Sequence, residues 1–149
     1  MDDVRVTRPA ETGYSIDELS VGMTATYAHT VTEGDVVKFA DISGDYNPVH
    51  LDEDFARTTR FGGRIVHGML SASFLSTTIA AKLPGPGTIY LTQNLVFRAP
   101  VRIGDRVEAQ VTVLDIIREK ARVLLKTVCR VGDTVVIDGD ALVMVPSRG

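Results

Sequence analysis

The sequence predicts an α+β protein in which a curved antiparallel sheet surrounds one long helix. Between Gly68 and Leu83 nearly every residue is apolar or small, so a helix there belongs in the interior of a protein. After residue 88, apolar and polar residues alternate over long segments, which is the pattern of half-buried strands. Because a helix that is apolar on all sides must be covered on all sides, a sheet curled around it is the simplest arrangement.

Length and composition limit the class of protein. The 149 residues correspond to one domain, and we expect a loosely ordered arm over residues 1–16 followed by a single domain over 17–149. With 44% hydrophobic and 23% charged residues, the composition is that of an ordinary globular chain. The formal net charge of −3 gives no general attraction for nucleic acid.

Two further features bear on location and redox chemistry. The first eight residues are acidic and polar with no apolar run behind them, so we expect no secretory signal, no membrane anchor and a cytoplasmic protein. Cys129 is the single cysteine, which excludes an internal disulfide and any multi-cysteine metal site. It falls in step with alternating apolar residues, so a buried structural thiol is predicted there.

Three helices are predicted from their end signals. Thr32 is a candidate cap with Asp35 three residues on, and the helix that follows should stop at Ser43 and Gly44. Acidic residues in a first turn predict a short helix over 52–57. The long apolar helix is terminated by the Pro-Gly-Pro-Gly segment at 84–87.

The remaining chain predicts strands. One strand precedes the first helix and four follow the long helix, and Gly132-Asp133 forms the turn between two of these. The predicted strands span residues 23–31, 88–97, 107–113, 121–129 and 135–145.

The loop after the first helix carries an acid, an amide and an imidazole within six residues. On an uninterrupted helix Asp45 and His50 would point about 140° apart and could not share a site. Pro48 lacks an amide hydrogen and biases Asn47 toward extended geometry, so the chain must turn and the two side chains can converge. This arrangement suits proton transfer, and the alternative is an Asx-turn followed by a partly exposed histidine.

Gly68 begins the long helix, where the first amides have no partner within the helix and the dipole is positive. A glycine there allows close approach of a carbonyl oxygen, so its amide can stabilise an oxyanion or enolate. The alternative is a tight turn leading into the helix.

Other chemistries have less support. His50, Asp52 and His67 could form a two-histidine, one-carboxylate iron site, although the second histidine lies unusually close to the first. The segment from Asp45 begins like a calcium loop but has no glycine at its sixth position, and Ala56 stands where the bidentate acid should be. No phosphate-binding loop and no nucleophile elbow occurs.

These residues resemble a known family. The segments Ser43–Asp52 and Ile65–Leu70, with Phe61 between them, are similar to the hydratase-2 motif of the MaoC-like (R)-specific enoyl-CoA hydratases. The resemblance continues through Leu83–Gly85 and Ile89–Leu91, covers about residues 17–145, and is strongest to single-domain members that supply hydroxyacyl-CoA for polyhydroxyalkanoate synthesis. It implies a hot-dog fold, a homodimer, and a hydro-lyase that adds water to trans-2-enoyl-CoA to give (R)-3-hydroxyacyl-CoA.

The resemblance also implies roles for single residues. Asp45 and His50 would act on the catalytic water, Asn47 would help to hold that pair, and the amide of Gly68 would bind the thioester oxygen. No metal or cofactor is implied, since coenzyme A is part of the substrate. His67 is expected to give structural support.

Three residues of the long helix are further candidates for substrate binding. Ser76 matches a serine that lines the site in single-domain members of the family. Leu75 and Ile79 are candidates for limiting acyl length, with ordinary core packing as the alternative.

Two rival functions remain at the level of sequence. A hot-dog thioesterase would hydrolyse acyl-CoA, and a non-catalytic accessory subunit would only bind it. The joint presence of Asp45, Asn47 and His50 favours the hydratase over both.

Overall fold

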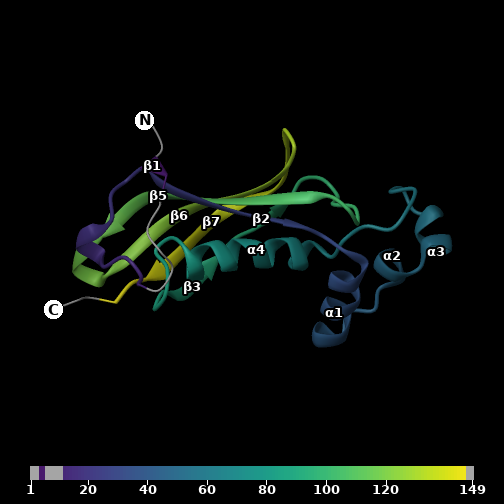
Figure 1. Ribbon diagram of the computed structural model, residues 1–149, viewed down its shortest axis with the longest axis horizontal. Coiled ribbons are helices and arrows are strands. Elements are labelled where there is room, and N and C mark those ends of the chain that lie inside the picture. Colours follow the sequence, from purple (N-terminus) through teal and green to yellow (C-terminus); the bar gives the residue numbers. More distant parts are fainter. Residues whose placement is uncertain (1–3, 6–11, 147–149) are drawn as a thin grey trace.

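The computed structural model describes residues 4–5 and 12–146, and it has the predicted architecture of a long helix held against a curved sheet. Figure 1 shows helix α4 (Gly68–Ala81) running along one side of the sheet, with the smaller helices projecting at one end. These smaller helices are α1 (Glu33–Ser43), α2 (Pro48–Leu51) and α3 (Glu53–Arg57). Short 3-10 turns lie at Ile16–Glu18 and Arg118–Lys120.

The sheet has the strand order β1-β2-β5-β6-β7-β3, and β4 also pairs with β7. All pairings are antiparallel except that of β1 with β2. The strands span Val4–Arg5 (β1), Met23–Thr30 (β2), Ile89–Gln93 (β3), Val96–Phe97 (β4), Arg106–Ile117 (β5), Arg122–Val131 (β6) and Thr134–Met144 (β7).

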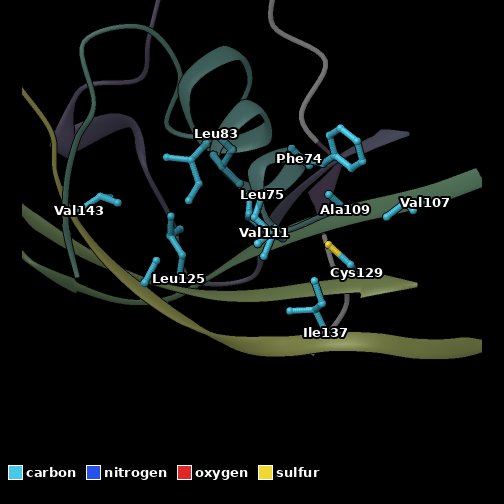
Figure 2. Close-up of a cluster of buried hydrophobic side chains, with 14 of the residues drawn as sticks. Phe74, Leu75, Leu83, Val107, Ala109, Val111, Leu125, Cys129, Ile137 and Val143 are labelled. Carbon is cyan, nitrogen blue, oxygen red and sulfur yellow. The ribbon is translucent and has the colours of Figure 1, made fainter. Parts of the chain in front are cut away.

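The core lies between α4 and the concave face of the sheet. Figure 2 shows Phe74 and Leu75 of α4 facing side chains from three neighbouring strands: Val111, Leu125, Cys129 and Ile137. Burial raises the pKa of the Cys129 thiol to about 12, so this cysteine is the structural thiol that the sequence predicts. Packing of this kind fixes α4, and with it the first residues of the helix at the functional site.

The helix end signals are confirmed. The Thr32 hydroxyl accepts from the Asp35 amide at 3.1 Å, and the Asp35 carboxylate accepts from the Thr32 amide at 2.9 Å. Gly44 ends α1 with a φ of 78°, the left-handed conformation that glycine adopts without strain.

Three segments differ from the sequence prediction. Residues 88–97, predicted as one strand, form the two short strands β3 and β4. Most of the arm expected over 1–16 lies outside the described residues, but its described end is packed: the Tyr14 amide donates to the Pro84 carbonyl at 2.7 Å, and Ser15 and Ile16 are buried. Residues 48–51, predicted as loop, form the single turn α2, because a proline is tolerated at a first helical position and the Asn47 side chain caps the turn. Among the described residues, no helix combines the length and the apolar character needed to cross a bilayer.

Candidate active site

The loop between α1 and α2 is held by its own side chains. The Asp45 amide donates to the Ser43 hydroxyl, the Asn47 amide donates to the Asp45 carboxylate at 3.1 Å, and the Val49 amide donates to the Asn47 side chain at 3.2 Å. The Asx-turn considered from the sequence is therefore present. It fixes the direction of the Asp45 carboxylate and leaves that residue exposed to solvent.

Asp45 and His50 converge, as the proline in the loop predicts. One ligand atom from each of Asp45, His50 and His67 lies within 4.8 Å of the other two. The His50 Nδ1 lies 2.8 Å from the Ile65 carbonyl oxygen, and because a carbonyl only accepts, this nitrogen carries the hydrogen. The Nε2 of a neutral His50 is consequently a free proton acceptor.

Burial lowers the pKa of His50 below its usual 6.5, although the hydrogen bond to the Ile65 carbonyl opposes that shift. His50 is 8% exposed, and the nearby His67 ring also disfavours its charged form. The neutral ring, which can take a proton, is therefore the favoured form near neutral pH.

Gly68 stands at the first position of α4, directly after His67. Within the described part of the chain its amide has no hydrogen-bond acceptor, as expected for the first turn of a helix. A Cβ at this position would lie 2.6 Å from a ring carbon of Phe97, so the Phe97 ring would have to move aside for any larger residue. The free amide and the positive end of a 14-residue helix together form a site for a developing oxyanion.

A pocket of about 440 Å³ opens beside these groups. Asp45, His67 and Gly68 line it together with the cationic Arg60 and Arg98, whereas His50 is not among its lining residues, and most of the remaining wall is apolar. The wall residues that sequence reasoning missed include Met69, Ser71, Phe97 and Ile137. Of these, Ser71 could have been found, since it lies one turn beyond Gly68 on the same face of the helix.

Two arginines hold the frame of the site. The Arg64 Nε donates to the His50 carbonyl at 2.7 Å, and its guanidinium forms an ion pair with Glu33 at 2.8 Å. The Arg102 guanidinium donates to the carbonyls of Phe61, Gly63 and Arg64. These contacts fix the chain between His50 and His67.

The other predicted residues lie outside this pocket. Asn47 caps α2, which agrees with a role in holding the loop. Leu75 and Ile79 are buried in the core, as the alternative reading of their position predicts, and Ser76 is half-buried further along α4. Substrate contacts by Ser76, Leu75 and Ile79 stay predictions.

The iron site considered from the sequence does not form as predicted. The Asp52 carboxylate accepts from the Phe55 amide at 3.1 Å and caps α3. Asp45 takes its place beside the two histidines. The ligand set that the sequence suggested, with Asp52 as its carboxylate, is therefore not assembled.

The antiparallel sheet around a long helix and the acid–base pair beside the start of that helix define an enzyme of the hot-dog fold. The chain belongs to the family described as MaoC like domain, whose model matches residues 19–135.

Curated relatives cover most of the chain. It is 51% identical over 133 residues to an (R)-specific enoyl-CoA hydratase of Rhodospirillum rubrum, across 89% of this chain and 92% of the relative. It is 50% identical over 132 residues to a 3-hydroxybutyryl-CoA dehydratase of Methylorubrum extorquens, across 89% and 84% of the two chains.

Solved structures agree with this assignment. The unliganded R-hydratase PhaJ1 of Pseudomonas aeruginosa is 44% identical with a TM-score of 0.85, covering 91% of this chain and 88% of its own. The (R)-hydratase of Aeromonas caviae involved in PHA biosynthesis is 42% identical with a TM-score of 0.83, covering 86% and 98%.

Proposed function

We propose that this protein is an (R)-specific enoyl-CoA hydratase, a hydro-lyase that adds water reversibly to trans-2-enoyl-CoA and gives (R)-3-hydroxyacyl-CoA. The observation that carries the proposal is the convergence of Asp45 with His50, beside a pocket that Asp45 and the free amide of Gly68 line. Relatives at 50–51% identity bear the names of a hydratase and of a dehydratase, which are the two directions of one reaction.

The chemistry follows from the polarisation of the substrate. The C3 atom of an enoyl thioester is electrophilic only as far as charge can flow to the thioester oxygen, and a hydrogen bond from the Gly68 amide stabilises that charge. Asp45 and His50 orient a water and remove one of its protons while its oxygen bonds to C3. A proton returned to C2 restores the thioester carbonyl, and the reverse sequence expels water.

The pocket accounts for an acyl substrate. Its apolar wall, which includes Met69 and Phe97, suits an aliphatic chain, and Asp45 and Gly68 on the same pocket suit the reacting thioester end. The reaction as proposed uses no metal and no cofactor, because the protein supplies both the proton acceptors and the oxyanion donor.

We also propose that the protein is a homodimer. The strand β3 is the last in the sheet, and its Ile89 and Leu91 are exposed apolar residues beside an unpaired edge. Val96 and Phe97 of the neighbouring β4 extend the apolar surface. A second copy of the chain would cover both the edge and these side chains. Polyhydroxyalkanoate synthesis as the pathway and the cytoplasm as the location stay predictions.

Replacement of the Asp45 carboxylate tests the assignment. Crotonyl-CoA is added to the purified protein, loss of enoyl-thioester absorbance is followed, and the product is coupled to an (R)-specific dehydrogenase. We expect rapid loss with an (R) product, and at least a hundredfold decrease of kcat in Asp45→Asn, since general base catalysis contributes roughly that much.

Asp54→Asn is the matched control, because Asp54 is an exposed acid of α3 outside the pocket. Full activity in Asp45→Asn would remove the acid–base assignment. Release of free coenzyme A without loss of the double bond would instead favour a thioesterase, and binding of acyl-CoA without any turnover would favour an accessory subunit.

A further inference from the structure

The His67 ring lies at the centre of the proposed site. It is 1% exposed, with the Phe39 ring at a centroid distance of 4.9 Å and the His50 ring at 4.0 Å, the latter nearly parallel at 29°. Its backbone leads directly into the amide of Gly68. His67 therefore contacts or adjoins each group to which a catalytic role is assigned.

The hydrogen bond of His67 fixes which of its nitrogens is free. The Nε2 lies 3.0 Å from the main-chain carbonyl oxygen of Asp45, and because a carbonyl only accepts, Nε2 carries the hydrogen. In the neutral ring Nδ1 is then a bare acceptor. Within the described residues this buried atom has no hydrogen-bond partner, and His67 is one of the residues that line the 440 Å³ pocket.

A buried acceptor without a partner is unfavourable unless a ligand or water donates to it. The pocket offers no protein donor to this nitrogen among the described residues. A molecule that binds in the pocket and carries a hydroxyl would satisfy it. The substrate water and the 3-hydroxyl of the product are the two hydroxyl-bearing groups that the proposed reaction places there.

An account of the two protons of the water shows what this acceptor does. One O–H bond breaks and its proton leaves through Asp45 and His50, whereas the other O–H bond stays intact and becomes the 3-hydroxyl of the product. Both Asp45 and the Nε2 of His50 are assigned to the hydrogen that leaves, so the hydrogen that stays on the oxygen is left to a different acceptor.

We propose that the Nδ1 of His67 accepts the hydrogen that remains on the oxygen, and thereby fixes the orientation of the attacking water and of the 3-hydroxyl in the bound product. With both hydrogens engaged, a lone pair of the water is held toward C3. His67 is thus a water-orienting residue as well as the structural support that the sequence predicts. This inference rests on the proposed hydratase function.

Two ligands of equal chain length separate this role from a structural one. (R)-3-hydroxybutyryl-CoA carries the 3-hydroxyl and butyryl-CoA lacks it, and both are measured as competitive inhibitors of crotonyl-CoA hydration. In His67→Gln, the side-chain amide can still donate to the Asp45 carbonyl, but the acceptor at the Nδ1 position is removed. In His67→Asn, an oxygen replaces Nδ1 and the donor to Asp45 is lost.

We expect the wild type to bind the hydroxylated ligand more tightly than butyryl-CoA. In His67→Gln the ratio of the two inhibition constants should fall about tenfold, with little change in the constant of butyryl-CoA, since one hydrogen bond is removed. His67→Asn should retain the preference while losing kcat, because its loop contact is gone. His29→Gln is the matched control, since His29 pairs with Asp35 away from the pocket that contains Gly68, and it should keep both inhibition constants.

An unchanged preference in His67→Gln would overturn the role assigned to Nδ1. An equal loss of affinity for both ligands would do so too, provided that circular dichroism shows the variant to be folded. A loss of the preference in His67→Asn together with its retention in His67→Gln would also overturn the role assigned to Nδ1. Failure of the wild type to hydrate crotonyl-CoA would instead contradict the proposed function itself.

Discussion

At the scale of single residues, the two histidines of the site are held in opposite tautomers by main-chain carbonyls. His50 donates from Nδ1 to Ile65, and His67 donates from Nε2 to Asp45. Each ring therefore has one nitrogen fixed by the backbone and one left as an acceptor. The arrangement keeps both rings ready to accept hydrogens without any motion of the backbone.

The pH dependence of activity is a prediction at this scale. Because burial lowers the pKa of His50 below 6.5, this base stays neutral at mildly acidic pH. In the pH profile of kcat/KM for crotonyl-CoA, we expect the midpoint of the acid limb to lie below pH 6.5, with activity decreasing as the pH falls through it. His29→Gln should leave the limb in place, and an acid limb centred above pH 6.5 would contradict the assignment of the base.

The same shift has a consequence for stability. Between the lowered pKa of folded His50 and 6.5, the unfolded chain binds more protons than the folded chain. The contribution of His50 to stability is therefore complete above pH 6.5 and is lost as pH falls through the folded pKa.

At the scale of elements, β7 is locked to the β3–β4 connection at Gly139. The Asn94 amide and side chain donate to the main chain and carboxylate of Asp140, and the Asp140 amide donates back to the Asn94 side chain at 3.0 Å. A Cβ at Gly139 would meet the carbonyl oxygen of Asn94. This oxygen belongs to the main chain, so it cannot move aside as the end of a flexible side chain could. The glycine is required by this close approach of two chain segments.

Replacement of Gly139 tests this close approach. Gly139→Ala should lower the free energy of unfolding by about 2 kcal/mol, the cost of forcing a methyl group into a closed space. Gly34→Ala is the matched control: Gly34 is exposed in α1, and its added Cβ would meet only the Thr32 hydroxyl at 3.7 Å. The control should raise stability by about 0.5 kcal/mol through helix propensity. Urea unfolding of both variants measures the difference, and equal effects would contradict the packing argument.

At the scale of the whole molecule, the sheet shields one side of α4 while one edge of the molecule remains apolar and exposed. Met69 at the start of α4 is 57% exposed and Phe97 is 52% exposed, and both line the pocket. The proposed site therefore opens toward the surface at which we propose the second copy. On this basis dimer formation would also complete the pocket wall.

Disruption of the edge tests the dimer. Wild-type protein should have a mass in solution of about twice the 16.1 kDa of one chain. Leu91→Lys should shift it toward the monomer, because a lysine on an unpaired strand edge opposes pairing. Leu114→Lys, at an exposed apolar position of β5, is the control that should leave the mass unchanged. Light scattering after gel filtration gives both masses, and a monomeric wild type would exclude the dimer.

Much of this architecture follows from local sequence signals. The Thr32 cap, the glycine at the end of α1, the apolar helix after Gly68 and the alternating strands were all predictable, because each depends on interactions within a few residues. The segment at 48–51 was missed as a helical turn because its single hydrogen-bonded turn depends on the Asn47 cap. The packing of residues 13–16 was missed because their partner, Pro84, is distant in the chain.

The sequence by itself identified Asp45, His50 and the amide of Gly68 as candidates, since the effects of Pro48 on the loop and of Gly68 on the start of the helix are local. The tertiary structure decided the rest. It brought His67 against His50, placed Leu75 and Ile79 in the core and set Phe97 over Gly68. It also left the Nδ1 of His67 without a partner among the residues that the structure describes. These features depend on contacts between elements that are far apart in the chain, and no local pattern of residues encodes which side chain meets which.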